Sequence, residues 1–147
     1  EIPARFHQRN WQPDAFVVIA RKSHPLALQQ MTLDTYCEAD HVLVSFRPDG
    51  TGAIDATLAQ LGQKRRIALV LSQFAVVADI VARTDYLATV AGSVAADVAE
   101  RAGCSVLALP FAQESWTNQV LWSAQTNADP AKRFAVQTFL DEGRTTK

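Results

Sequence analysis

The amino-acid sequence predicts an α/β fold, because short apolar runs alternate with helical patterns along most of the chain. The apolar runs are bounded by polar or turn-forming residues, which is typical of strands buried on both faces. The segments between them place apolar residues three and four positions apart and often end at glycine, as helices do. Strands that alternate with helices in this way favour right-handed crossovers within one sheet.

The size and composition predict about one domain with a sizeable core. The chain has 147 residues, of which 48% are hydrophobic and 20% charged, as is ordinary for globular proteins. Its formal net charge is −1, and its basic residues are dispersed except at residues 64–66. We interpret this Lys-Arg-Arg cluster as a solvated helix end. Nucleic-acid binding by this piece alone is not expected, because it requires a concentrated basic face.

Cysteine usage and hydropathy restrict the setting of the protein. Cys37 and Cys104 are too few and too far apart for a disulfide framework or a metal site, although a single bridge between them stays open. They fit a reduced, cytosolic setting. No apolar run approaches the ~20 residues of a membrane span, and no signal-peptide pattern is present. Because the first residue is Glu1 rather than methionine, we expect a longer natural protein.

The first predicted elements are a strand and a short helix. Residues 1–13 suggest irregular structure. Residues 16–20 are continuously apolar and predict a strand, which the Ser23-His24-Pro25 segment stops because proline cannot donate to a ladder. Thr32 is expected to cap a short helix over residues 32–37.

A second strand, a helix and a third strand follow. Residues 41–46 predict the second strand, and residues 47–52 form a turn-rich loop. A helix is expected over 53–61, where apolar residues share one face and Gly62 occupies the C′ position. Residues 67–71 predict the third strand.

The next segment repeats this alternation. Ser72 is expected to cap a helix over 73–82, and residues 86–90 predict a fourth strand. A Gly-Ser pair then opens a helix over 94–102, which Gly103 ends.

The last elements are two strands and a helix. Residues 105–109 predict a short strand stopped by a proline, and residues 118–123 predict another strand. Asp129 and Pro130 are a strong helix start, with aspartate as N-cap and proline at the first position. That helix is expected to run to about residue 141.

Taken in order, these segments resemble the C-terminal effector-binding domain of LysR-type bacterial transcriptional regulators. The resemblance spans about residues 2–142 and rests on the ordered set rather than on any single motif. Its carriers are FVVIARKSHPLA at 16–27, HVLVS at 41–45, IDATLAQLGQKRRI at 54–67, SQF at 72–74 and TDYLATV at 84–90. Ala91, Ser123 and Phe134 stand where the family often has Pro, His and Trp. The HVLVS and SQF segments look closest to the branch of nodulation and aromatic-catabolism regulators.

The resemblance implies a type 2 periplasmic-binding-protein-like fold, in which two α/β subdomains are joined by two crossover strands and enclose a ligand cleft. It also implies that the family's N-terminal winged helix-turn-helix and the opening of the first subdomain precede this chain. Apolar edges at residues 16–20 and 120–122 would then be left exposed. The implied parts are 1–24 (first subdomain and crossover), 25–88 (second subdomain), 89–142 (return crossover and remainder of the first) and 143–147 (tail).

The function that the resemblance implies is sensing of a small molecule. The effector, with a lean towards an aromatic or carboxylated compound, would bind in the cleft and change the arrangement of a dimer or tetramer. The predicted helices at 54–61 and 94–102 are candidates for the pairing surface. Promoter DNA would be bound only through the winged helix-turn-helix that precedes this chain. We expect a cytoplasmic, membrane-free protein without a cofactor.

The candidate effector-binding residues follow from strand ends, because ligands of open α/β sheets bind beyond the carboxyl ends of the strands. Their side chains can stack on a ring or hydrogen-bond a carboxylate, and the free N–H groups of a following helix favour an anion. For Ser72 and Phe74 the alternatives of a plain helix cap and a core residue stay open. The candidates are Ser45, Phe46, Ser72, Gln73, Phe74, Thr89 and Val90.

Other chemistry is not indicated. His24 suggests a solvated loop residue, and His7 and His41 have no partners at metal-ligand spacing. Residues 50–52 lack the Gly-Lys-Ser/Thr continuation of a phosphate loop. No catalytic, metal or cofactor residue is predicted. Two rivals share the fold: a type 2 solute-binding protein of a transport system, which needs an export signal upstream, and an enzyme, which needs an acid–base or nucleophile set.

Overall fold

The computed structural model describes residues 3–45 and 51–142. Its contacts divide the chain into two compact units. Unit 1 combines Glu1–Asp14 with Ser115–Lys147, and unit 2 is the continuous stretch Ala15–Glu114. Inside unit 2, the strand that ends at Arg21 pairs with the strand that starts at Leu87. The subdomain limits at residues 24/25 and 88/89 stay a prediction.

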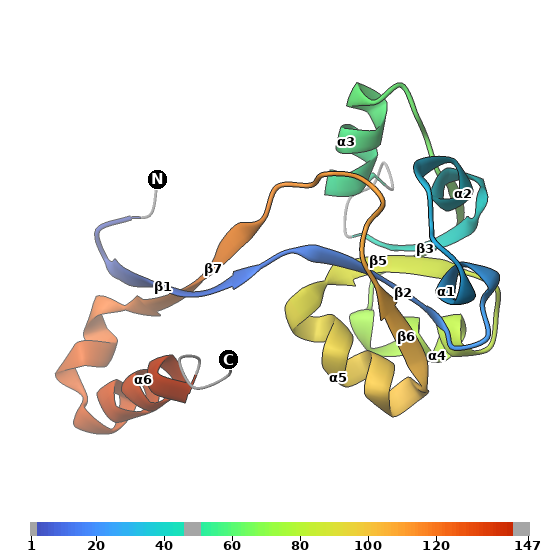
Figure 1. The fold of residues 1–147 in the computed structure, drawn as a ribbon. Helices are drawn as coiled ribbons and strands as arrows, with labels where there is room; N and C mark the ends of the chain where they lie inside the picture. Colours follow the sequence, from blue (N-terminus) through green and yellow to red (C-terminus); the bar gives the residue numbers. More distant parts are fainter. Residues whose placement is uncertain (1–2, 46–50, 143–147) are drawn as a thin grey trace. The chain divides into compact units, whose positions relative to one another are not determined.

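Unit 2 is built on a mixed five-stranded sheet in the order β4-β3-β5-β2-β6 (Figure 1). β3 runs parallel to β4 and β5, whereas β2 runs antiparallel to β5 and β6. The carboxyl ends of β3, β4 and β5 therefore lie at one edge of the sheet. The strands are β2 (Phe16–Arg21), β3 (Asp40–Val44), β4 (Arg66–Leu71), β5 (Leu87–Ala91) and β6 (Cys104–Leu107).

Helices cover both faces of this sheet, which confirms the α/β class. In Figure 1, α2 and α3 lie above the sheet and α4 and α5 below it. Within residues 3–45 and 51–142, no helix is both long and apolar enough to cross a membrane. The helices are α1 (Pro25–Leu28), α2 (Leu33–Glu38), α3 (Ala53–Gln60), the 3₁₀ turn η1 (Phe74–Val76), α4 (Val77–Ala82) and α5 (Gly92–Ala102).

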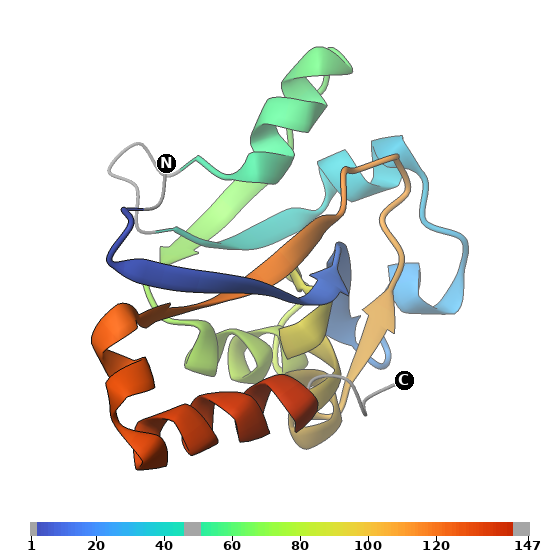
Figure 2. The ribbon, with the colours of Figure 1, turned by 90° about the vertical axis from the view of Figure 1, so that its left-hand side faces the viewer.

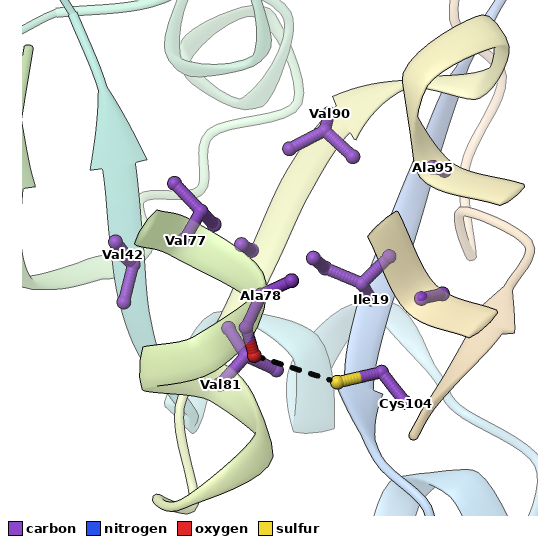
Figure 3. Packing of buried hydrophobic residues seen from close by; sticks show 10 residues of the cluster. Ile19, Val42, Val77, Ala78, Val81, Val90, Ala95 and Cys104 are labelled. Carbon is purple, nitrogen blue, oxygen red and sulfur yellow. Dashed lines mark hydrogen bonds between the residues drawn. The ribbon is translucent and has the colours of Figure 1, made fainter. Parts of the chain in front are cut away.

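Two apolar cores form because strand side chains alternate between the faces. Ile19 packs with α4 and α5 on one face, while its neighbours Val18 and Ala20 pack with α1, α2 and α3 on the other. Figure 3 shows the first core, where the Cys104 thiol donates to the Ala78 carbonyl oxygen at 3.6 Å. Both cysteines are buried and free, so no bridge joins them.

The predicted cap of α2 and the glycines after α3 and α5 are confirmed. Thr32 forms a capping box with Thr35 at the start of α2. Gly62 and Gly103 follow α3 and α5 with φ angles of 68° and 71°, which favour glycine after a helix.

The prediction of an exposed apolar edge at residues 16–20 is wrong. β2 lies inside the sheet and pairs with β5 and β6, so Val18, Ile19 and Ala20 are completely buried. The prediction assumed that covering strands would have to come from outside this chain. β6 and β5 supply the pairing instead.

The prediction that Ser72 caps a helix over 73–82 is also wrong. The chain first forms the 3₁₀ turn η1, whose N-cap is Gln73 and has no side-chain cap bond. α4 then starts at Val77, again without a side-chain cap. The start is stabilised by packing instead, since Val77, Ala78 and Val81 are buried in the first core.

Unit 1 pairs the two ends of the chain. β1 (Phe6–Asp14) and β7 (Trp116–Ser123) form an antiparallel ribbon, and η2 (Ala124–Ala128) and α6 (Pro130–Glu142) follow β7 in the orange and red part of Figure 2. Residues 1–13 were predicted to be irregular, which is wrong for most of that stretch. β1 carries mostly exposed polar side chains, so its pairing with β7 rather than an apolar pattern makes it a strand.

One aromatic pair joins the two ends of the chain in unit 1. The Trp11 and Phe139 rings stack with centroids 4.8 Å apart, and Leu140 is buried. As predicted, Asp129 caps α6, where its carboxylate accepts from the Ala131 N–H at 3.0 Å.

Candidate functional site

A cavity of about 210 Å³ opens at the carboxyl ends of β3 and β5 in unit 2. Val44 ends β3 and Ala91 ends β5, while Phe16 starts the antiparallel β2 directly opposite Ala91. This is the edge at which ligands of α/β sheets bind. The lining residues are Phe16, Leu43, Val44, Ala53, Ile54, Arg65, Phe74, Thr89, Val90 and Ala91.

The wall of this cavity is apolar except for two side chains. Arg65 and Thr89 supply its polar groups, and Phe16 and Phe74 supply aromatic rings. Phe74 is 45% exposed although it is large and apolar, so its ring is available to a ligand.

The structure brings some of the predicted effector-binding residues together and not others. Phe74, Thr89 and Val90 line the cavity. Ser45 lies just after β3, where its N–H donates to the Leu71 carbonyl oxygen at 2.9 Å and its hydroxyl donates to the Thr51 carbonyl oxygen. Ser45, Ser72 and Gln73 are not among the described lining residues, and Ser72 and Gln73 are exposed. Phe46 lies outside the described residues.

An arginine–aspartate pair forms the base of the polar wall. Arg65 Nε donates to Asp55 Oδ1 at 2.8 Å, and Nη2 donates to Oδ2 at 3.0 Å, which is the two-pronged geometry of strong pairs. The Arg65 side chain is only 1% exposed. The interpretation of residues 64–66 as a solvated cluster is therefore wrong for Arg65, whose side chain is drawn inwards by Asp55 of α3. Lys64 and Arg66 are exposed, as expected.

Asp55 is held as a carboxylate by three N–H donors. Besides Arg65, the Gly52 N–H donates to Asp55 Oδ2 at 2.8 Å. Burial alone would raise the pKa of Asp55, but the bonds from Arg65 and Gly52 lower it. Burial works against the charge of Arg65, yet the bonds to Asp55 raise its pKa. A side chain at Gly52 would meet Asp55 Oδ2 and Leu43 at 3.2 Å, so this close approach favours glycine.

Tyr36 connects this pair to the cavity wall. Arg65 Nη1 donates to the Tyr36 hydroxyl at 3.3 Å, and that hydroxyl lies 2.7 Å from Thr89 Oγ1. Tyr36 is completely buried, and burial raises its pKa although Arg65 and Thr89 act to lower it. A continuous chain of hydrogen bonds thus joins Asp55, through Arg65 and Tyr36, to Thr89.

His41 is a second buried titratable group beside this chain. Its Nε2 lies 2.7 Å from the Tyr36 carbonyl oxygen, and because a carbonyl oxygen only accepts, Nε2 must carry the hydrogen. Nδ1 is buried and has no partner among residues 3–45 and 51–142. Burial lowers the pKa of His41 from its ordinary 6.5 to about 4. The ring is therefore neutral at pH 7.

We expect His41 to make the protein less stable in acid. The unfolded chain takes up a proton near pH 6.5, whereas the folded chain does so only near pH 4, so the free energy of unfolding falls between these values. Urea unfolding measures this free energy at pH 7 and at pH 5. Between the two, it should fall by about 2 kcal/mol more in the wild type than in His41→Gln. An equal loss in both proteins would contradict this assignment. Glutamine retains a donor for the Tyr36 carbonyl.

His24 is not the solvated loop residue that was predicted. It is 5% exposed, and its Nδ1 accepts from the Leu26 N–H at 3.0 Å at the start of α1. Nε2 then carries the hydrogen and donates to the Asp85 carbonyl oxygen at 3.1 Å. The histidine therefore caps a short helix and ties it to the loop before β5.

Two larger hollows of about 540 Å³ each lie elsewhere in unit 2. One includes Cys37, Glu38 and Arg66, near the amino ends of β3 and β4. The other lies between the segment after α1 and the edge strand β6. Neither lies at the carboxyl ends of the parallel strands. A third hollow, of about 240 Å³, is lined by side chains of α4, α5 and the turn before α4. The cavity at the ends of β3 and β5 is the candidate site because of its position.

Asp55, Arg65 and Tyr36 were not recognised as site residues from the sequence. The spacing of Gly52 and Asp55, an N-cap and the third residue of a helix, is a readable signal for the carboxylate position. No sequence pattern predicts that Arg65 and Tyr36 lie beside this carboxylate. Their proximity depends on how α2, α3 and β4 pack.

Comparison with known proteins identifies the family. The family described as LysR substrate binding domain matches residues 2–145. The chain is 32% identical over 136 residues to the HTH-type transcriptional activator NahR of Pseudomonas putida, a match that covers 92% of this chain and 45% of NahR. It is 30% identical over 141 residues to the HTH-type transcriptional activator NagR of a Ralstonia species, covering 96% of this chain and 47% of NagR.

Solved structures agree with this assignment. The regulatory domain of MexT, a transcriptional activator in Pseudomonas aeruginosa, matches with a TM-score of 0.74 and 28% identity, covering 93% of this chain and 66% of that one. The probable transcriptional regulator PA0477 of the same organism gives a TM-score of 0.76 and 26% identity, with 93% and 44% covered. These matches confirm the type 2 periplasmic-binding-protein-like fold. The chain spans about half the length of the curated relatives it matches, and it belongs to the LysR substrate-binding domain family.

Proposed function

We propose that this chain is the effector-sensing region of a LysR-type transcriptional regulator, and that the cavity at the carboxyl ends of β3 and β5 takes part in binding the effector. The observation that carries the proposal is the cavity wall, which is apolar except for Arg65 and Thr89. An apolar hollow with a few convergent polar groups is typical of small-molecule sites. Family membership supports the sensing role.

The chemistry of the wall favours an aromatic compound that carries a carboxylate or carbonyl group. A dry apolar cavity of about 150 Å³ is large enough to bind benzene, and this cavity measures about 210 Å³. Phe16 and Phe74 offer ring contacts. Arg65 and Thr89 offer hydrogen-bonding groups to an oxygen atom at the edge of the ring. This supports the lean towards aromatic or carboxylated effectors.

The whole regulator would convert binding into a change at promoter DNA. NahR and NagR are named as helix-turn-helix activators and are about twice as long as this chain, so the DNA-binding part is assigned to a segment outside it. An effector would act by binding one arrangement of a dimer or tetramer better than another. α3 and α5 stay the predicted pairing surface. We place the regulator in the cytoplasm, off the membrane and without a cofactor.

The rival functions have less support. A solute-binding protein shares the fold, but the family match and the relatives are those of transcriptional regulators. For an enzyme, the described part of the cavity wall would need an acid–base pair or an activated nucleophile. Its polar side chains are Arg65, paired with Asp55, and the hydroxyl of Thr89. We infer that the region binds its ligand without transforming it.

Blocking the cavity tests the proposal. Ala53 and Ala56 are both exposed on α3, but only Ala53 lines the cavity. Ala53→Trp should fill the space with an indole ring, whereas the matched control Ala56→Trp adds the same ring outside it. With benzoate as the probe, NMR titration should show binding that Ala53→Trp weakens by about tenfold or more, equivalent to about 1.4 kcal/mol.

The control defines what each result means. Ala56→Trp should bind benzoate as the wild type does, within about twofold. Equal binding by both tryptophan variants would remove this cavity as the site. The same titration with ring-substituted benzoates would then rank candidates for the natural effector.

A further inference from the structure

The hydrogen-bond chain behind the cavity has a fixed direction at one end. An arginine side chain only donates and a carboxylate only accepts, so the bonds between Arg65 and Asp55 run from nitrogen to oxygen. For the same reason the 3.3 Å bond between Arg65 Nη1 and the Tyr36 hydroxyl must be donated by Arg65. The Tyr36 oxygen is therefore an acceptor towards Arg65.

This leaves one partner for the hydrogen of Tyr36. The residue is completely buried, and among residues 3–45 and 51–142 its hydroxyl contacts only Arg65 and Thr89. If Thr89 were the donor in their 2.7 Å bond, the Tyr36 hydrogen would be buried without an acceptor. Such unmade bonds are more costly than the gain from an ordinary one. Tyr36 must therefore donate to Thr89.

The direction of the chain decides what Thr89 can offer to a ligand. Its oxygen already accepts from Tyr36, so its own hydrogen is directed elsewhere. In the described part of the chain, Thr89 Oγ1 has no second partner, and the half-buried residue lines the cavity. We propose that Thr89 is a hydrogen-bond donor into the cavity and a specificity-determining residue for ligands with an acceptor oxygen. This inference rests on the proposed function of the cavity.

The rest of the wall strengthens the same preference. Three of the five N–H groups of Arg65 are used by Asp55 and Tyr36, and the other two are also donors. The acceptor of the cluster, Asp55, receives three N–H bonds and is not in the lining. The unpaired side-chain hydrogens of Arg65 and Thr89, the two polar lining residues, are therefore donors. A carboxylate or carbonyl oxygen satisfies them, whereas a ligand with only donor hydrogens leaves them unpaired.

Three single-ring probes separate this donor role from the shape of the cavity. Benzoate and acetophenone offer only acceptor oxygens, with and without charge, while toluene offers neither donor nor acceptor. Thr89→Val removes the hydroxyl at nearly constant volume. In NMR titrations, Thr89→Val should bind benzoate about tenfold and acetophenone about fivefold more weakly than the wild type. Its affinity for toluene should change by less than about twofold. Thr89→Ser should bind all three as the wild type does.

Thr89→Val also leaves the Tyr36 hydroxyl without its acceptor. A second pair of variants separates this effect from the loss of the Thr89 donor. Tyr36→Phe retains the Thr89 hydroxyl and should retain acetophenone binding. The double variant Tyr36→Phe with Thr89→Val leaves no buried hydroxyl unpaired and should lose that binding about fivefold. Equal acetophenone binding by Tyr36→Phe and the double variant would overturn the donor role of Thr89.

The same titrations distinguish failure of this inference from failure of the proposed function. If Ala53→Trp blocks the probes but the Thr89 variants do not alter them, the cavity binds ligands and the donor role is wrong. If no probe binds the wild type, or if Ala53→Trp binds the probes unchanged, the proposed function fails and the donor role fails with it. A toluene loss equal to the acetophenone loss in Thr89→Val would also overturn the donor role.

Discussion

Replacing Asp55 by asparagine is expected to lower the free energy of unfolding by about 3 kcal/mol, because it leaves a buried arginine without its counter-charge. The Arg65 side chain is 1% exposed and makes two of its hydrogen bonds to Asp55. Asparagine has nearly the same shape, so little packing is lost. Urea unfolding at pH 7 measures the change.

The matched control is the exposed pair between Arg21 and Asp85. Arg21 Nε donates to Asp85 Oδ1 at 2.7 Å, but the Asp85 side chain is 73% exposed. Asp85→Asn should therefore cost less than about 1 kcal/mol. A second variant that combines Asp55→Asn with Arg65→Met should recover part of the loss, since it removes the unpaired charge. Equal losses from Asp55→Asn and Asp85→Asn would show that burial of Arg65 contributes nothing.

Replacing Leu58 by alanine is expected to cost about 3 kcal/mol through the cavity that it leaves. Leu58 is completely buried on α3 and belongs to the core that also holds Val18, Tyr36 and Leu87. This core supports the wall of the candidate site from behind. Partial collapse around the missing methyl groups would make the cost smaller, and the measured value reports how rigid that support is.

Leu61 offers the control for this variant within the same segment. It directly follows α3 and is 49% exposed, so Leu61→Ala should cost less than about 1 kcal/mol. Unfolding curves in urea with unchanged slopes would show that both values are differences in stability rather than in compactness. Similar losses at Leu58 and Leu61 would contradict the assignment of α3 as the cover of this core.

Elements with their own local signals were predictable from the sequence. Residues close together in the sequence specify three such features: the strand at residues 16–20, the Thr32 cap and the glycines after α3 and α5. β1 could not be predicted in this way. Its side chains are mostly polar and exposed, and it is a strand because β7 provides the partner for its backbone groups.

The candidate site was only partly predictable. Strand order places the ends of β3 and β5 together, so Thr89 and Val90 followed from topology. The Arg65–Asp55 pair did not, because charged residues are mostly solvated and the exception depends on a partner ten residues away in the sequence. The position of Tyr36 in the site could not be predicted either, since its hydrogen-bond partners Thr89 and Arg65 lie in other parts of the chain.

The pairing of β1 with β7 has a consequence for the order of events during protein synthesis. β1 ends at Asp14 and β7 begins at Trp116, and the whole of unit 2 is made between them. At elongation rates of about 5–20 residues per second, roughly 5–20 seconds pass between the synthesis of β1 and that of β7. Unit 2 is contiguous in sequence and can fold in that interval. We expect exposed polar residues of β1, such as His7 and Arg9, to disfavour its pairing with other nascent chains before β7 is made.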